Sequence, residues 1–222
     1  YDDSADSAVM ENLFRIMYQN HPVRNNIAGT VESIEEITAD TLTLCHSAFY
    51  DPSNLIVCVI GDVDAASVIE QVRKQTPEGC RPQLERCYGA PEPAEVKTRT
   101  IEKQMEISMP SFAIGFRCPD AGRGAEAMRM ELIGELAGEM LAGESSKLYQ
   151  KLYDENVIDA DFSVDYERMK GMALLELAGD SEDPERILRE VLQQAETIGR
   201  TGVDRAQLER LKKSVTGRRL RE

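Results

Sequence analysis

Hydrophobic positions recur with helical spacing at the start of the chain and again in several later segments. Val9, Leu13, Ile16 and Met17 share one face of a helix predicted over residues 5–19. Thr38 is a suitable N-cap for a second helix that ends at Tyr50. The same spacing predicts helices over residues 65–75, 124–142, 145–155, 184–199 and 203–220.

Other segments have the length and composition of β-strands. Leu55 to Ile60 is a continuous apolar run rich in β-branched residues, which is typical of a strand covered on both faces. Met109-Pro110 separates two further strands, and Lys170-Gly171 joins another pair. These four strands are predicted over residues 96–108, 111–117, 161–168 and 172–178.

The resulting order is β-α-β-β-α-α-β-β-α-α. Hairpin strands with helices arriving in pairs predict an α+β fold, a two-layer sandwich with a mainly antiparallel or mixed sheet and paired helices on one face. With 222 residues and 41% hydrophobic content, the chain can bury a substantial core.

Charge and hydropathy narrow the set of partners. The formal net charge of −14 opposes binding to a phosphate backbone, so we expect no nucleic-acid partner. No apolar run reaches the length of a membrane span, so we expect no membrane partner. The basic residues between Arg205 and Glu222 fit either a docking surface or a solvated helical face whose last turn complements the helix dipole.

The five cysteines are odd in number and contain no C-x-x-C pair. This pattern favours free thiols in a reducing compartment, and we therefore expect a cytoplasmic location. Cys80 and Cys87 share one connection and could pair if oxidised. The absence of an initiating Met favours a segment of a longer protein.

The stretch from His21 to Asp64 carries a family resemblance. It contains His21-Pro22, Gly29-Thr30, Phe49-Tyr50 with Asn54, and Gly61-Asp62. In this order they resemble the insulinase, pitrilysin and mitochondrial processing peptidase family of zinc peptidases. The resemblance implies the metallohydrolase-like two-layer module that this family uses in tandem, over about residues 1–220.

The family's zinc motif, His-x-x-Glu-His, does not occur in this chain. The chain has two histidines: His21, before a proline, is expected to anchor a loop, and His46 is expected to be a partly buried helical residue. Glu11 on the first helix is the carboxylate considered as a substitute ligand, and we expect it on a solvated face. The resemblance implies that zinc binds elsewhere in the parent protein and that this chain holds no cofactor.

The same resemblance implies a division of the chain. Residues 1–33 correspond to the trailing helix and loop of a preceding zinc-bearing module, and residues 34–222 to the module without metal ligands. Many metal-free halves of the family carry an Arg and a Tyr where this chain has Tyr153 and Ala160. The segment therefore resembles the back end of the zinc-bearing half, and a degenerate second half remains an alternative.

A second resemblance lies in Gly138 to Tyr153, where a Gly/Ser-rich turn precedes Ser-Lys-Leu-Tyr. It implies that the turn faces substrate. The alternative is a plain helix–helix turn, in which Gly143 adopts a left-handed conformation and Ser145 caps the next helix. The residues assigned to the substrate-facing surface are Gly143, Glu144, Ser145, Ser146 and Tyr149.

Two functions follow from the resemblance. In the first, the chain is a structural and substrate-enclosing module of a zinc metalloendopeptidase and is itself inactive. In the second, it belongs to a non-catalytic family member that binds or scaffolds. Either way the expected partners are the remaining modules of the parent peptidase or a paired subunit, with a peptide substrate in the full enzyme.

Overall fold

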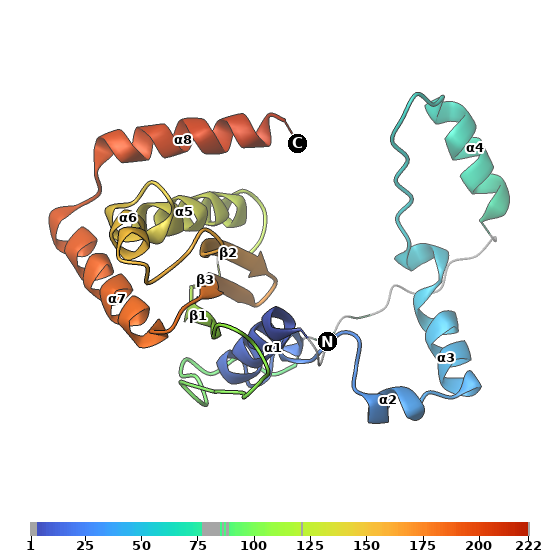
Figure 1. Cartoon of the computed structure of the whole chain (residues 1–222). Coiled ribbons are helices and arrows are strands. Elements are labelled where there is room, and N and C mark those ends of the chain that lie inside the picture. Colours follow the sequence, from blue (N-terminus) through green and yellow to red (C-terminus); the bar gives the residue numbers. More distant parts are fainter. Residues whose placement is uncertain (1–3, 77–84, 86, 88, 121, 222) are drawn as a thin grey trace. The chain divides into compact units, whose positions relative to one another are not determined.

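The computed structural model describes residues 4–76, 85, 87, 89–120 and 122–221. The chain forms two compact units (Figure 1). The larger unit combines residues 1–25 with residues 89–222, and the smaller unit contains residues 26–88. The module boundary expected between residues 33 and 34 concerns a longer protein and stays a prediction.

A three-stranded antiparallel sheet forms the centre of the larger unit, with the strand order β1-β3-β2. β2 and β3 form a hairpin whose two-residue turn, Lys170-Gly171, places the glycine at a φ of 82°. The hairpin expected from the sequence is confirmed. The strands are β1 (Ser111–Arg117), β2 (Ser163–Met169) and β3 (Met172–Asp180).

Helices cover both faces of this sheet. α1 (Ala5–Met17) buries Leu13 and Met17 against Met172 and Leu174 of β3. On the opposite face, residues of alternate register such as Leu177 and Phe112 pack against α5, α6 and α7. The helices of this layer are α5 (Ala125–Ala142), α6 (Lys147–Asp154) and α7 (Pro184–Thr201), and α8 (Arg205–Arg219) lies beside α5.

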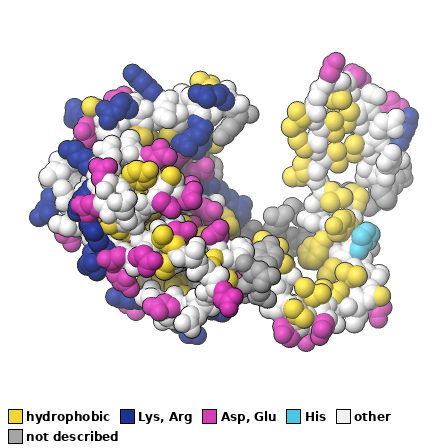
Figure 2. Space-filling view, in the orientation of Figure 1, with side chains coloured by type: hydrophobic (Ala, Val, Ile, Leu, Met, Phe, Trp, Pro, Cys, Tyr) yellow, Lys and Arg dark blue, Asp and Glu magenta, His cyan; other side chains and the backbone are white. Residues whose placement is uncertain are grey.

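The described part of the smaller unit contains three α-helices, a short 3-10 helix (Pro52–Asn54) and an extended segment. Thr30, Thr38 and Asp64 cap its helices through their side-chain oxygens, as expected for Thr38. None of the described side chains of these helices is buried, and Figure 2 shows hydrophobic side chains gathered on its surface at the right of the view. Its α-helices are α2 (Val31–Glu35), α3 (Ala39–Phe49) and α4 (Ala65–Gln75).

Two of the predicted strands do not form. Leu55–Ile60 is extended but unpaired and exposed, because the described residues offer it no neighbouring strand. The prediction that this run is a covered strand is therefore wrong for this chain. Residues 96–108 are irregular, since β1 pairs with β3 and not with this partly charged segment.

The cysteines in the described part of the chain are free thiols, namely Cys45, Cys58, Cys87 and Cys118. Cys80 lies outside the described residues, so its pairing with Cys87 stays open.

Two glycines on α5 allow the helix to approach the sheet. A methyl group on Gly134 would overlap the ring of Tyr166 on β2. One on Gly138 would lie 2.8 Å from Leu175 Cδ1 on β3. A helix seldom favours glycine, so these positions indicate that close packing outweighs helix propensity here.

Gly134→Ala should therefore destabilise the protein by about 1–3 kcal/mol, because the added methyl group forces α5 and Tyr166 apart. Gly199→Ala on α7 is the matched control, since a methyl group there meets no atom within 4 Å. The control should gain about 0.5–1 kcal/mol from helix propensity. Urea unfolding of both variants measures the difference, and two changes of the same sign would contradict the packing argument.

A carboxyl group is buried on the central strand. Glu176 is 8% exposed and lies directly opposite Asp165 of β2. Burial, followed by repulsion from Glu167 and Asp165, raises the pKa of Glu176 to about 7. Above its ordinary pKa of 4.5 the unfolded chain releases this proton, while the folded protein retains it until about pH 7. The contribution of Glu176 to stability is thus complete below about pH 4.5 and is lost as the pH rises through 7.

Glu176→Gln should remove this loss, because the amide imitates the protonated carboxyl group. Relative to the parent, we expect a gain on the order of 1–3 kcal/mol at pH 8 and almost none at pH 4. Thermal unfolding across this range, with the exposed Glu196→Gln on α7 as control, measures the effect. An equal change at both pH values would show that titration of Glu176 is not the cause.

Candidate functional site

A cavity of about 560 Å³ lies at the C-terminal end of α5, in the larger unit. Residues of β2 and α8 complete its walls, among them Asp165, Leu211 and Val215. Three of the five residues expected to face substrate line this cavity: Gly143, Glu144 and Ser145. Glu144 and Ser145 are exposed to solvent, whereas Gly143 is buried. Whether this surface contacts substrate stays a prediction.

The turn between α5 and α6 differs in detail from the expected helix–helix turn. Gly143 has a φ of −67°, so it does not adopt the expected left-handed conformation. Space explains the glycine instead, because a Cβ atom would lie 2.7 Å from the carbonyl oxygen of Glu139. The cap is Ser146, one residue later than the expected Ser145, and α6 begins at Lys147. Ser146 Oγ accepts a hydrogen bond from the Tyr149 N–H at 3.0 Å, and its side chain is 1% exposed.

Tyr149 is not among the residues that line the cavity. Its ring stacks on Tyr153 with centroids 5.9 Å apart and packs at the same distance against Phe162. Burial, with a smaller effect of Glu144, raises the pKa of the Tyr149 hydroxyl. Tyr149 therefore supports the cavity wall through Phe162, which does line the cavity.

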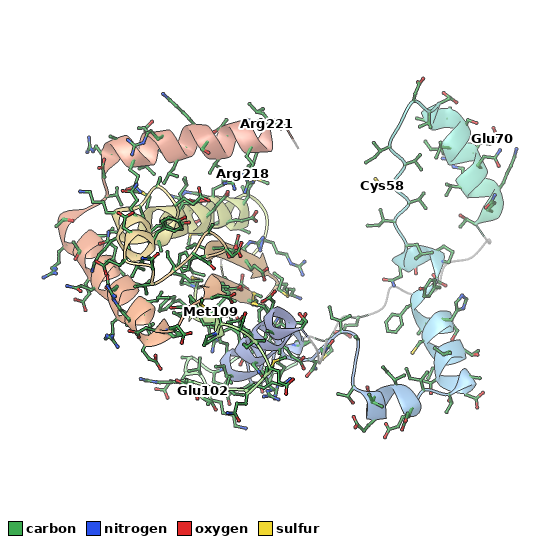
Figure 3. All side chains as sticks on the ribbon, viewed as in Figure 1. Cys58, Glu70, Glu102, Met109, Arg218 and Arg221 are labelled. Carbon is green, nitrogen blue, oxygen red and sulfur yellow. The ribbon has the colours of Figure 1, made fainter. Side chains whose placement is uncertain are left out.

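Charges of both signs surround the cavity. On α8, Arg218 reaches Glu135 at 3.0 Å and Glu139 at 4.0 Å. Arg218 and Arg221 both lie near the C-terminal end of the chain (Figure 3). Arg219 pairs with Glu135 at 3.1 Å. Burial raises the pKa of Glu139, and nearby carboxylates add to this effect while Arg218 opposes it. Part of the basic C-terminal cluster thus attaches α8 to α5.

These residues are equipped for binding. Exposed Glu144 offers a carboxylate, Ser145 a hydroxyl group, and Arg218 and Arg221 cationic groups to a polar chain. Sequence reasoning identified the turn and gave the basic C-terminal cluster as a possible docking surface, but it did not place the two at one cavity. The basic residues at 218, 219 and 221 indicated a charged end of this helix, but the pairing of Arg218 and Arg219 with Glu135 depends on how α8 packs against α5.

The histidines do not fit a zinc site. His21 Nδ1 accepts from the Val23 N–H at 3.1 Å, and Nε2 lies 2.9 Å from the Lys170 carbonyl oxygen, to which it must donate. Both ring nitrogens are therefore occupied, which confirms His21 as a loop anchor. His46 is exposed and stacks on Tyr50, so the expectation of partial burial is wrong. In the part of the chain that the structure describes, no three His, Cys, Asp or Glu side chains gather to hold a metal ion.

Glu92 completes the anchoring of the same loop. Its carboxylate accepts hydrogen bonds from three successive backbone N–H groups, those of Gln19, Asn20 and His21, the last at 2.8 Å. Partial burial would raise the pKa of Glu92, but these hydrogen bonds and the charge of Arg117 lower it overall. Glu92 and His21 thus have structural roles. Glu11 is exposed on α1, as expected.

None of the helices among the described residues is long and apolar enough to cross a membrane.

Comparison with known proteins identifies the chain's relatives. The sequence profile of the family described as "Peptidase M16 inactive domain" matches residues 36–215. An uncharacterized zinc protease of Bacillus subtilis, YmfH, is 34% identical over 86% of this chain and 45% of its own length. Zinc protease PqqE of Helicobacter pylori is 25% identical over 95% of this chain and 48% of its own length. The chain therefore spans about half the length of these curated relatives.

Solved structures agree. A crystal structure of an M16-like peptidase from Alicyclobacillus acidocaldarius matches 99% of this chain and 52% of that chain, with a TM-score of 0.89 and 29% identity. A peptidase M16 inactive domain from Pseudomonas fluorescens has the same fold, with a TM-score of 0.76 at 19% identity. On this evidence the chain belongs to the peptidase M16 family, as a module of the inactive-domain type.

Proposed function

We propose that this chain is the substrate-enclosing, non-catalytic module of a zinc metalloendopeptidase. In this proposal the cavity at the end of α5 contacts the bound peptide. Zinc belongs to another part of the complete protein, because the histidines and carboxylates among the described residues do not form a ligand set. The remaining modules or a paired subunit would provide the catalytic residues.

One observation carries the proposal. Gly143, Glu144 and Ser145, which the family resemblance assigns to the substrate surface, line a single cavity with cationic groups from α8. A peptide backbone is rich in carbonyl and amide groups, so a cavity with exposed donors and acceptors of both charges suits it. The names of the relatives support the zinc-peptidase reading over a scaffold that only binds.

The free thiols support the cytoplasmic location that the cysteine pattern predicts. Cys45, Cys58, Cys87 and Cys118 are free, which suits a reducing compartment such as the cytoplasm.

Replacing Glu144 and Ser145 together with Ala in the complete gene product should raise KM severalfold for a peptide of ten or more residues. The kcat for a short peptide should stay within about twofold, because lost uniform binding raises KM without lowering kcat. Ser146 is left intact because it is the buried cap of α6. Steady-state kinetics on a long and a short peptide measure the effect.

The matched control is Glu196→Ala, which removes an exposed carboxylate from α7 at a position outside the cavity lining. A melting curve of each variant excludes loss of folding. If the double variant loses turnover of the short peptide while its affinity and melting temperature stay unchanged, the turn belongs to the catalytic apparatus. That outcome would reject the proposed role.

A further inference from the structure

A buried carboxyl group lacks a partner on the face of the sheet that α1 covers. Glu176 of β3 is 8% exposed, and its carboxyl group makes no hydrogen bond or ion pair with the described residues. Leu174, two residues earlier on the same face, is completely buried beneath α1. Buried polar groups almost always have a hydrogen-bond partner, so the isolated position of Glu176 requires an explanation.

Two further carboxylates lie on the same side of the β2–β3 hairpin. Asp165 is directly opposite Glu176, and Glu167 is two residues further along β2. Alternate residues of a strand share a face, so Asp165, Glu167 and Glu176 form one carboxylate face of the hairpin. Like charges opposite each other destabilise an antiparallel pair. Asp165 and Glu167 are exposed and likewise make no ion pair with the described residues.

The basic side chains nearest in sequence and register do not neutralise the carboxylate face. Arg168 of β2 points to the opposite side of the sheet, where its guanidinium lies 3.7 Å from Glu131 of α5. Arg117 of β1 shares the side of Glu176, but it is engaged elsewhere. Its guanidinium donates to the Pro93 carbonyl oxygen at 2.7 Å and lies over the ring of Tyr18.

Helix α1 covers one side of the carboxylate face and leaves the β2 side open. Gly115 of β1 is directly opposite Glu176, and Leu13 and Met17 of α1 lie over it. These side chains are apolar and provide no charge. Within the described sheet β2 is the edge strand, and its Asp165 lines the cavity at the end of α5. The open side of the carboxylate face is therefore continuous with that cavity.

We propose that the carboxylate face binds the cationic side chain of a lysine or arginine in the bound peptide. This inference rests on the proposed function, because Asp165 connects the carboxylate face with the cavity assigned to the peptide. An ammonium or guanidinium group provides the opposite charge and donates the hydrogen bonds that Glu176 lacks. A metal ion is a less suitable occupant, since no three potential ligand side chains gather to hold one among the described residues.

Binding of the cation should be linked to the protonation of Glu176. Its pKa of about 7 results from burial, followed by repulsion from Glu167 and Asp165. A cation favours the charged carboxylate, so its binding releases the proton of Glu176 and lowers this pKa. The preference for a cationic side chain should therefore be strongest above about pH 7 and should weaken as the pH falls through that value.

Steady-state kinetics of the complete gene product with two sets of acetylated peptides test the proposal. Each peptide of ten or more residues in the first set carries one lysine, at a different position in each. The second set carries norleucine there, which keeps the aliphatic chain and removes the charge. At pH 8 we expect at least one lysine peptide to have a KM on the order of tenfold below that of its norleucine partner. At pH 5.5 the advantage should shrink to about threefold or less.

Glu176→Gln should remove most of the lysine advantage at pH 8 and make the remainder independent of pH, because the amide has no charge. Asp165→Asn is a second variant at an exposed position, and it should reduce the advantage severalfold. Glu196→Gln on α7 is the matched control and should leave the ratio of KM values within about twofold of the parent. Equal KM values for the two peptide sets at every position would overturn the proposal. A full lysine advantage in folded Glu176→Gln would overturn it as well.

This test separates the proposal from the proposed function. The double replacement of Glu144 and Ser145 reports whether long peptides contact the turn, whereas the ratio of lysine to norleucine KM values reports on the carboxylate face. An effect of the double variant beside a ratio of one would reject the cation site alone. A lysine advantage that depends on Glu176, without any effect of the double variant, would support the cation site and reject the turn as peptide surface.

Discussion

Pairing of β3 on both of its edges is the interaction on which the larger unit depends. β1 and β2 hold β3 in the middle of the sheet, and Leu174 and Leu177, which point to opposite faces, are completely buried. Because each face of β3 carries buried apolar side chains, each needs a layer of helices. α1 covers one face, and α5, α6 and α7 cover the other. The position of α5 then fixes the position of the turn at Gly143. Ion pairs of Arg218 hold α8 against α5, and the cavity lies between residues of these two helices and β2.

Leu55–Ile60 shows what the same kind of strand does without partners. Its apolar, β-branched sequence is as suitable for an inner strand as that of β3, yet it stays exposed. The hydrophobic pattern of a strand indicates whether it is suited to burial. It does not indicate whether the neighbouring strands are present in the same chain. This explains why the strand prediction failed here while the hairpin of β2 and β3, whose partners are adjacent in sequence, was confirmed.

The helices were predictable for a related reason. Capping residues such as Thr38 and the periodicity of α7 are local signals, and they placed most helices within a few residues of their observed ends. The candidate site was only half predictable. Gly143, Glu144 and Ser145 came from a local motif, whereas the approach of Arg218 depends on how α8 packs and could not be read from spacing along the chain. The same limit applied to Ser146, whose role as the cap depends on a shift of one residue.

We propose that this module of an M16 peptidase contributes binding surface and that the metal chemistry belongs to the rest of the complete protein. Metal analysis of the purified 222-residue chain, combined with hydrolysis of an unstructured peptide, tests it most directly. We expect less than stoichiometric zinc after dialysis and no hydrolysis above background, because both nitrogens of His21 are engaged and no ligand cluster forms among the described residues. One bound zinc per chain together with hydrolysis that a chelator abolishes would contradict it.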